Sequence, residues 1–506
     1  MIARVQTACL DGVQARRVWV EADVGGGLPS VRLVGLTDRA VQEAKERVRS
    51  AIDNSGFVFP QHRVTINLAP AELPKEGTAF DLAIALAVLK SGAKTKLGVR
   101  AARALENEQQ GFIGELGLDG NIRAVRGALA LSSLLAEAGA LRLFVPSANA
   151  AEAASSGVPV HPVDSLREVV QYLGRSTAIP AAEAMKESSA HGGTLDLSEI
   201  QQQDVPKRAL EIAAAGGHHV LFTGPPGSGK SMLARAFAGL LPDLSPAEAK
   251  TVTAIHSVAG LLSEPGLVRR PPLRSPHHST SLAGLLGGGR SFRPGELTLA
   301  HHGVLVLDEL PEFHRDCLEA LREPLEEGTI RLSRAHGMRL LPARFCLVAT
   351  ANPCPCGRAG ATSGDDECAC PPELVARYQR KVSGPLRDRI DLVVQVRPVG
   401  LERLRENPHG SQSAPARGRV VAARAMQGTR QGPGNLNAGL SGPALEEVCL
   451  LDEKASARLP RISAAYGLTG RGFFSVMRVA RTIADLDGSG VISERHLVEA
   501  CAYRSG

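Results

Sequence analysis

The most chemically specific segment of this sequence is a glycine-rich loop that fits the pattern G-x-x-x-x-G-K-[ST], Gly224-Pro225-Pro226-Gly227-Ser228-Gly229-Lys230-Ser231. An apolar run typical of a strand precedes it at 220–223, and a helical pattern follows at 232–241. In such a loop the backbone N–H groups surround phosphates, the lysine neutralises β- and γ-phosphate charge, and the Ser hydroxyl binds Mg²⁺. The segment therefore predicts a nucleotide site with ATP and Mg²⁺ as its cofactors.

Two acidic residues follow a second apolar strand. The run 303–307 ends in Asp308-Glu309, where the aspartate can hold Mg²⁺ and Glu309 can orient and polarise the attacking water. The alternative is that the pair only serves the N-terminus of the helix predicted from Pro311 onward. Because a phosphate loop lies upstream, we favour the catalytic interpretation.

Three later residues are candidates to complete the site. Asn352 follows the strand 345–350, and its amide could position the same water, although an isolated Asn is commonly a turn residue. The segment Arg387-Asp388-Arg389 precedes the strand 392–396, and an arginine there is either a salt-bridge partner or an arginine finger for a neighbouring subunit. Arg471 begins a helix, and since a cation is unfavourable there, a functional role is favoured.

Four of the nine cysteines are concentrated in one glycine-rich segment, as Cys354, Cys356, Cys368 and Cys370. Four thiolates can close a tetrahedral Zn²⁺ site. The C-x-C spacing is tighter than the usual C-x₂-C, and the alternative is four reduced surface thiols. We expect a structural zinc that fixes the loop after Asn352.

Two basic segments are candidates for DNA contact. Arg290 and Arg293 lie in a glycine-rich loop between the two nucleotide motifs, and Arg334 and Arg339 lie in a hairpin predicted at 329–340. In a ring of subunits both segments could point into the pore and bind phosphates. A hairpin that packs subunits together is the alternative.

The composition excludes several classes of protein. Of 506 residues, 43% are hydrophobic and 22% charged, which is typical of a globular chain, and the net charge of +6 is too small to indicate a partner. Residues 331–430 are locally basic, with 17 Lys and Arg against 8 Asp and Glu. No apolar run reaches a membrane span of about 18 residues, and the start lacks a secretory h-region. We therefore expect a cytoplasmic protein without a membrane partner.

The elements that must position these residues are of the α/β class. Residues 1–174 combine strands at 64–68 and 143–146 with helices at 39–54 and 80–89, which predicts a mixed domain. Residues 175–195 have a linker composition. Residues 196–400 alternate apolar strands and helices, which favours a parallel sheet. Residues 401–506 are mainly helical, with an interruption at 428–437.

Together, the phosphate loop, the Asp-Glu strand end, the Asn and the two late arginines resemble an AAA+ ATPase. The flanking segments resemble the magnesium-chelatase-like YifB/ComM family of bacteria along essentially the whole chain. Among them are Val34-Gly35-Leu36, Asn67-Leu68-Ala69-Pro70-Ala71, the stretch 74–83, Ser275-Pro276-His277-His278, Arg293-Pro294-Gly295-Glu296, the stretch 308–313, Asn352-Pro353-Cys354-Pro355-Cys356-Gly357 and the stretch 478–485.

The resemblance implies a ChlI-type N-terminal domain with the fold of the Lon protease domain, an AAA+ core and a helical lid. Ala79 stands where the protease has its nucleophilic Ser, so no protease activity is expected. By the motif match, Gln203 lies near the adenine pocket, Arg389 is the trans-acting finger and Arg471 the sensor-two arginine. Arg387 stands where the family usually has Leu, which makes it a second finger candidate.

The family also implies a function. A ring, expected to be a hexamer, would hydrolyse ATP to remodel DNA, as ComM-type helicases do by branch migration in natural transformation. Two alternatives remain open: a chelatase-type ATPase that helps insert Mg²⁺ into a porphyrin, and a regulatory ATPase with a protein client.

Overall fold

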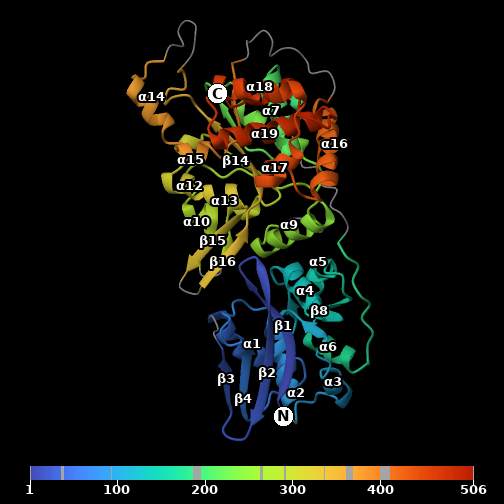
Figure 1. Cartoon of the computed structure of the whole chain (residues 1–506). Coiled ribbons are helices and arrows are strands. Elements are labelled where there is room, and N and C mark those ends of the chain that lie inside the picture. Colours follow the sequence, from blue (N-terminus) through green and yellow to red (C-terminus); the bar gives the residue numbers. More distant parts are fainter. Residues whose placement is uncertain are drawn as a thin grey trace.

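The computed structural model contains an N-terminal mixed sheet, a parallel sheet and a C-terminal helical region (Figure 1). The N-terminal domain lies at one end of the molecule, and the parallel sheet and the C-terminal helices lie at the other. No helix within the described ranges is both long and apolar enough to cross a membrane. The structure describes residues 2–35, 39–92, 94–185, 195–262, 266–289, 292–334, 337–359, 368–398 and 411–504.

The N-terminal domain is built on a seven-stranded mixed sheet of order β3-β4-β2-β1-β5-β8-β9. Its strands are β1 (Ala3–Asp11), β2 (Gln14–Gly25), β3 (Ser30–Val34), β4 (Arg63–Ala69), β5 (Gln110–Phe112), β8 (Arg142–Pro146) and β9 (Val160–Val163). Side chains alternate along β1, so Val5 and Cys9 belong to one hydrophobic cluster and Ala8 to another. The first cluster includes α1 (Arg39–Asn54), α2 (Asp81–Ser91) and α6 (Leu166–Leu173), and the second includes α4 (Ala128–Glu137) and α5 (Ala150–Ala154).

The second sheet has five strands, all parallel, in the order β11-β14-β17-β10-β18. They are β10 (Val220–Thr223), β11 (Leu273–Arg274), β14 (Gly303–Leu307), β17 (Phe345–Ala351) and β18 (Leu392–Gln395). The parallel arrangement agrees with the prediction from the apolar strands. Because β10 lies between β17 and β18, the segments that follow these three strands meet at one edge of the sheet.

The C-terminal region is helical, as predicted. Its helices are α16 (Ser413–Gln431), α17 (Gly442–Val448), α18 (Glu453–Ala465), α19 (Gly470–Leu486) and α20 (Glu494–Ala502). Together with α7 (Asp204–Gly216) they form one hydrophobic cluster with the parallel sheet. The predicted interruption starts later than expected, because α16 continues through Gly428 to Gln431.

The two sheets are joined by direct contacts between their domains. The N–H of Gly127, at the start of α4, donates to the hydroxyl of Ser257 at 3.0 Å, and Ser257 donates to the buried carboxylate of Glu152. Ser257 belongs to α9 (Pro246–Ala259), which lies between the two domains in Figure 1. At the tip of the β1–β2 hairpin, Val13 joins a hydrophobic cluster of the domain that contains the parallel sheet. The N-terminal domain is thus packed against the second sheet.

Candidate functional site

The phosphate loop follows β10 and leads into α8 (Lys230–Ala236), which begins two residues before the predicted helix and changes into a 3₁₀ turn at Phe237–Leu240. Gly227 and Gly229 have φ values of +74° and +92°, in the left-handed region that favours glycine. A Cβ on Gly224 would lie 2.2 Å from the carbonyl oxygen of Val396. These glycines allow the tight turn that exposes backbone N–H groups at the start of the helix.

Lys230 connects this loop to the end of β17. Its ammonium donates to the carbonyl oxygens of Gly224 and Pro225, both at 2.8 Å, and to the amide oxygen of Asn352 at 3.2 Å. Burial lowers the pKa of Lys230. The structure therefore places Asn352 beside the phosphate loop.

Asp308 and Ser231 lie close enough to share a metal ion. The Ser231 hydroxyl donates to Oδ2 of Asp308 at 2.8 Å. A hydroxyl and a carboxylate oxygen are ligands that suit Mg²⁺, which retains several waters when bound to proteins. The two residues follow different strands, β10 with its loop and β14, so the parallel sheet creates the pair.

Thr350 is a site residue that sequence reasoning missed. Its hydroxyl donates to Oδ1 of Asp308 at 2.5 Å and accepts the backbone N–H of Glu309 at 2.9 Å. The side chain thereby orients both acidic residues of the β14 end. The only available indication was its position just before Ala351 and Asn352, on the strand beside β14.

Glu309 occupies an unusual backbone position with φ of +55°. Its side chain is about half exposed, and its Oε2 lies 3.8 Å from Nδ1 of His278. A glutamate held at the end of β14 and open to solvent can orient water, as a general base requires. The motif residue His278 therefore lies beside the carboxylate of Glu309.

Gln203 lies immediately before α7, with φ of +62°. Its side-chain amide donates to the carbonyl oxygens of Arg397, at 2.6 Å, and Ser228, at 3.4 Å. The Gln203 side chain thus links the phosphate loop to the segment after β18. This position is compatible with the expected adenine pocket.

The two finger candidates differ in their surroundings. Arg389 follows α15 (Gly384–Arg387); its guanidinium forms an ion pair with Glu326 and donates to the carbonyl oxygen of Pro385 at 2.8 Å. Arg387 is exposed at the end of α15 and lines a cavity of about 530 Å³ with Gln379 and Arg380. Arg389 is therefore held by its own chain, whereas Arg387 faces solvent.

Arg471 is exposed in the first turn of α19, whose N-cap is Thr469. The buried side of α19 is attached to Asp391: Ser475 donates to its Oδ1 at 2.6 Å, and Nδ1 of His218 lies 2.9 Å from its Oδ2. Burial by itself raises the pKa of the Asp391 carboxyl, but the contacts from His218, Arg478 and Ser475 hold that pKa well below its usual range. The segment that carries Arg389 is thus fixed to the helix that carries Arg471.

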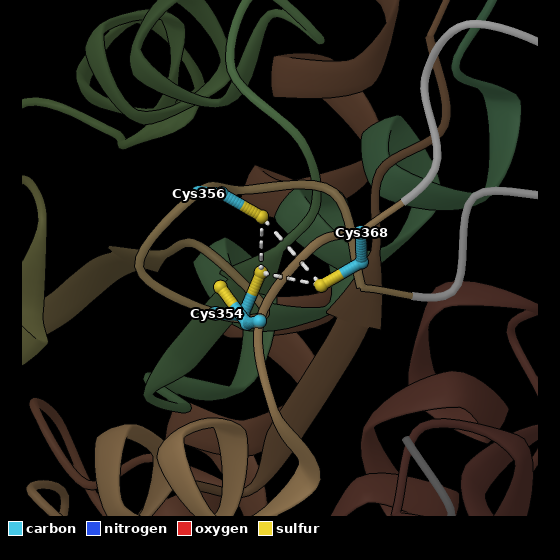
Figure 2. A group of neighbouring side chains, drawn as sticks. Cys354, Cys356 and Cys368 are labelled. Atoms are coloured by element: carbon cyan, nitrogen blue, oxygen red, sulfur yellow. Dashed lines mark hydrogen bonds between the residues drawn. The ribbon is translucent and has the colours of Figure 1, made fainter.

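The four cysteines of the glycine-rich segment come together after β17. The sulfur atoms of Cys354, Cys356 and Cys368 face one another (Figure 2). All four Sγ atoms, including that of Cys370, lie within 4.8 Å of each other. The prediction of a convergent four-thiol cluster therefore has a geometric basis.

The candidate DNA-binding arginines have different surroundings. Arg293 is exposed on β13 (Arg293–Pro294), and Arg290 lies outside the described residues. The predicted hairpin is present as β15 (Thr329–Arg334) and β16 (Gly337–Pro342), although the side chain of Arg334 is not described. Arg339 forms an ion pair with Asp11 and lies over the ring of Phe292. In this conformation Arg339 joins two domains.

Comparison with known proteins agrees with this architecture. Three family models match in succession: "Subunit ChlI of Mg-chelatase" over residues 20–149, "Magnesium chelatase, subunit ChlI" over 196–404, and "Magnesium chelatase, subunit ChlI C-terminal" over 410–504. The chain is 42% identical to YifB of Escherichia coli (strain K12), over 99% of this chain and 96% of the relative.

Two further relatives carry names that indicate a role. The competence protein ComM of Haemophilus influenzae is 40% identical, over 100% of this chain and 97% of that protein. The magnesium-chelatase 38 kDa subunit of Cereibacter sphaeroides is 25% identical, over 59% of this chain and 87% of that subunit. With full-length identity of this order, a ChlI-type sheet domain and a P-loop site of AAA+ type, the chain belongs to the magnesium-chelatase-like YifB/ComM family of AAA+ ATPases.

Proposed function

We propose that this chain is an ATP-driven motor that assembles as a hexameric ring and remodels DNA by branch migration or unwinding. The hydrolytic part rests on the convergence of Lys230, Asp308 and Asn352 at one edge of the parallel sheet. The DNA part is supported by full-length identity to a competence protein and by the basic segment 331–430. Natural transformation and recombination are the settings in which such a motor would act.

Each residue has an assigned role in this proposal. Ser231 and Asp308 would hold Mg²⁺, which offsets the charge of the transferred phosphoryl group. Lys230 exchanges its carbonyl partners for phosphate oxygens, while Glu309 orients the attacking water. Asn352 positions the same water. Arg389 from a neighbouring subunit stabilises the transition state, and Arg471 responds to the nucleotide from the lid.

The N-terminal domain has the Lon-protease-type fold but no protease chemistry in this proposal. Ala79 offers only a methyl group, and its carbonyl oxygen accepts the N–H of Gly114 at 3.0 Å. Lys75 nearby in sequence is buried, and burial lowers its pKa. The domain should neither cleave an unfolded protein substrate nor react with serine-directed inhibitors.

The ATPase rate with and without DNA tests the central proposal. Purified full-length protein is assayed alone, with single-stranded DNA and with forked DNA, and the Glu309→Gln variant serves as the blank. Stimulation by DNA that disappears in the variant is expected, followed by strand displacement on forked substrates. An ATPase rate that does not change with any of these DNA substrates would overturn the proposal of a DNA motor. Only the ATPase activity would then remain.

A second candidate function follows from the match to the chelatase subunit. A magnesium-chelatase-type ATPase, or a regulatory ATPase, would act on a partner protein. Such a protein would hydrolyse ATP without DNA stimulation. Dependence of its rate on a porphyrin and partner chains would identify the chelatase-type role.

A further inference from the structure

The four-thiol cluster has the dimensions of a tetrahedral metal site. Tetrahedral Zn²⁺ with Zn–S bonds of about 2.3 Å requires sulfur atoms about 3.8 Å apart. The Sγ of Cys354 lies 3.2 Å from that of Cys356 and 3.6 Å from that of Cys368, and the last two are 3.5 Å apart. A modest expansion of this triangle would admit the ion, with Cys370 as the fourth ligand.

The backbone around the cluster supports thiolate ligands. The N–H of Ala359 donates to the Sγ of Cys354 at 3.2 Å, and Gly357 closes the intervening turn by donating to the carbonyl oxygen of Cys354 at 2.9 Å. N–H groups directed at a ligating sulfur fix its orientation and offset its charge. Cys354 is fully buried, while Cys356 is exposed, so the cluster spans from the protein interior to the surface.

The same turn packs directly on the phosphate loop. Gly357 has φ of +80°, and a Cβ placed on it would lie 2.4 Å from Cδ of Pro226. Two residues before Cys354, Asn352 accepts from Lys230. The turn at residues 354–357, the cysteine turn, therefore contacts Pro226, and Asn352 just before it contacts Lys230. This segment thus touches the phosphate loop at two points.

On its other side the cluster is attached to a helix. Cys370 is followed by Pro371 and by α14 (Pro372–Gln379), and the side-chain amide of Gln379 donates to the carbonyl oxygen of Pro353 at 3.1 Å. A metal bound by Cys354 and Cys370 would close the chain between β17 and α14. Closure of such a loop limits how far the cysteine turn can move away from Pro226.

We propose that Cys354, Cys356, Cys368 and Cys370 bind one Zn²⁺ and that the cysteine turn, held by this ion, braces the phosphate loop through the contact of Gly357 with Pro226. Soft thiolate ligands in a four-coordinate arrangement suit Zn²⁺ rather than Mg²⁺. The ion is structural, because all four positions are filled by protein. The bracing role rests on ATP binding at the proposed site, whereas the zinc site itself does not.

Metal content tests the first half independently of ATP. Elemental analysis by inductively coupled plasma mass spectrometry should find about one zinc per chain in full-length protein purified without added metal. Replacement of zinc by Co²⁺ should give the intense visible bands of tetrahedral thiolate coordination. The Cys368→Ser/Cys370→Ser double variant should lose the ion, while the control Cys501→Ala, a buried thiol in α20, should retain it. Folded wild-type protein with little zinc, or with disulfides among the four cysteines, would overturn the site.

Nucleotide affinity tests the second half. The dissociation constant of a fluorescent ATP analogue should rise about tenfold or more in the zinc-free double variant, as when a supporting contact of a metal site is lost. Gly357→Ala should retain zinc and still bind the analogue more weakly, because its methyl displaces Pro226. Unchanged affinity in both variants would overturn the bracing role. Absence of ATP binding by the zinc-loaded wild type would instead contradict the proposed function.

Discussion

Arg339, on the second strand of the β15–β16 hairpin, forms an ion pair with Asp11 at the tip of the β1–β2 hairpin. Its guanidinium also lies 5.3 Å from the ring centroid of Phe292. Only 20% of the Arg339 side chain and 9% of that of Asp11 are exposed. The N-terminal domain thus holds an arginine that we expect to contact DNA, and this ion pair would have to open before Arg339 could bind a phosphate.

Removing the Asp11 charge should therefore strengthen DNA binding. Asp11→Asn releases Arg339, and one additional phosphate contact should make the slope of log affinity against log salt steeper by about 0.9. Filter binding or fluorescence anisotropy at several salt concentrations measures this slope. Glu108→Gln, which removes an exposed charge from the same domain, is the matched control. If both variants bind DNA like wild type, Arg339 is purely an interdomain contact.

Thr350→Val should reduce hydrolysis with little effect on folding. The valine keeps the shape of the side chain but removes the hydroxyl that orients Asp308 and accepts the Glu309 N–H. Loss of such a supporting hydrogen bond reduces metal affinity or activity about 10- to 100-fold. The rate is measured against Mg²⁺ concentration, and Thr350→Ser, which keeps the hydroxyl, should restore most of it. A Val variant with wild-type Mg²⁺ dependence would contradict this role.

The arginine finger can be assigned with mixed rings. Arg389→Ala should lower the ATPase rate by about 10³-fold or more, as should Lys230→Ala. When the two variants are mixed equally, the Lys230→Ala subunits still supply Arg389 to their neighbours, so about a quarter of the wild-type rate should return.

A mixture of Arg387→Ala and Lys230→Ala subunits shows which of the two arginines is the finger. If Arg387 is the finger, its variant alone is inactive and complements Lys230→Ala, while Arg389→Ala stays active. Glu326→Gln, which frees Arg389 without removing it, should keep activity. If neither arginine variant complements in mixed rings that assemble, no finger acts in trans.

The Asp391 network should couple the stability of the C-terminal helical region to pH. Asp391→Asn weakens the contacts of Ser475, His218 and Arg478, and should cost about 2–4 kcal/mol in the free energy of unfolding. Since the folded-state pKa of Asp391 lies below its usual range, its contribution is fully present above about pH 5 and is lost progressively as the pH falls toward the folded-state value. Urea unfolding of both proteins at pH 7 and pH 3.5 should show the difference shrinking in acid. An equal difference at both pH values would contradict this account.

Much of the fold could be predicted because local sequence patterns determine its helices and strands. The strand at 220–223 and the helix at 39–54 have the predicted bounds in the structure, since apolar periodicity and burial coincide there. The helix after the phosphate loop was less well predicted. Its N-terminus is set by the loop itself, because Gly229 in a left-handed conformation turns the chain directly into Lys230.

Side-chain partners across the fold could not be predicted in the same way. Nothing in the sequence around Arg339 indicates a contact with Asp11, which lies 328 residues away in the chain. Thr350 is an ordinary strand residue until β17 lies beside β14 and places its hydroxyl between Asp308 and Glu309. Such contacts depend on strand order and on docking of domains, which no short segment determines.

The sequence by itself determined the chemistry that is available: a phosphate loop, an acidic strand end, four thiols and a set of arginines, each recognisable because its residues are close together in the chain. Tertiary structure decided which of these groups meet. The parallel sheet brings Lys230 to Asn352 and Ser231 to Asp308 because β10, β14 and β17 end at one edge. The cysteine turn reaches Pro226 for the same reason, since it follows β17 where the phosphate loop follows β10.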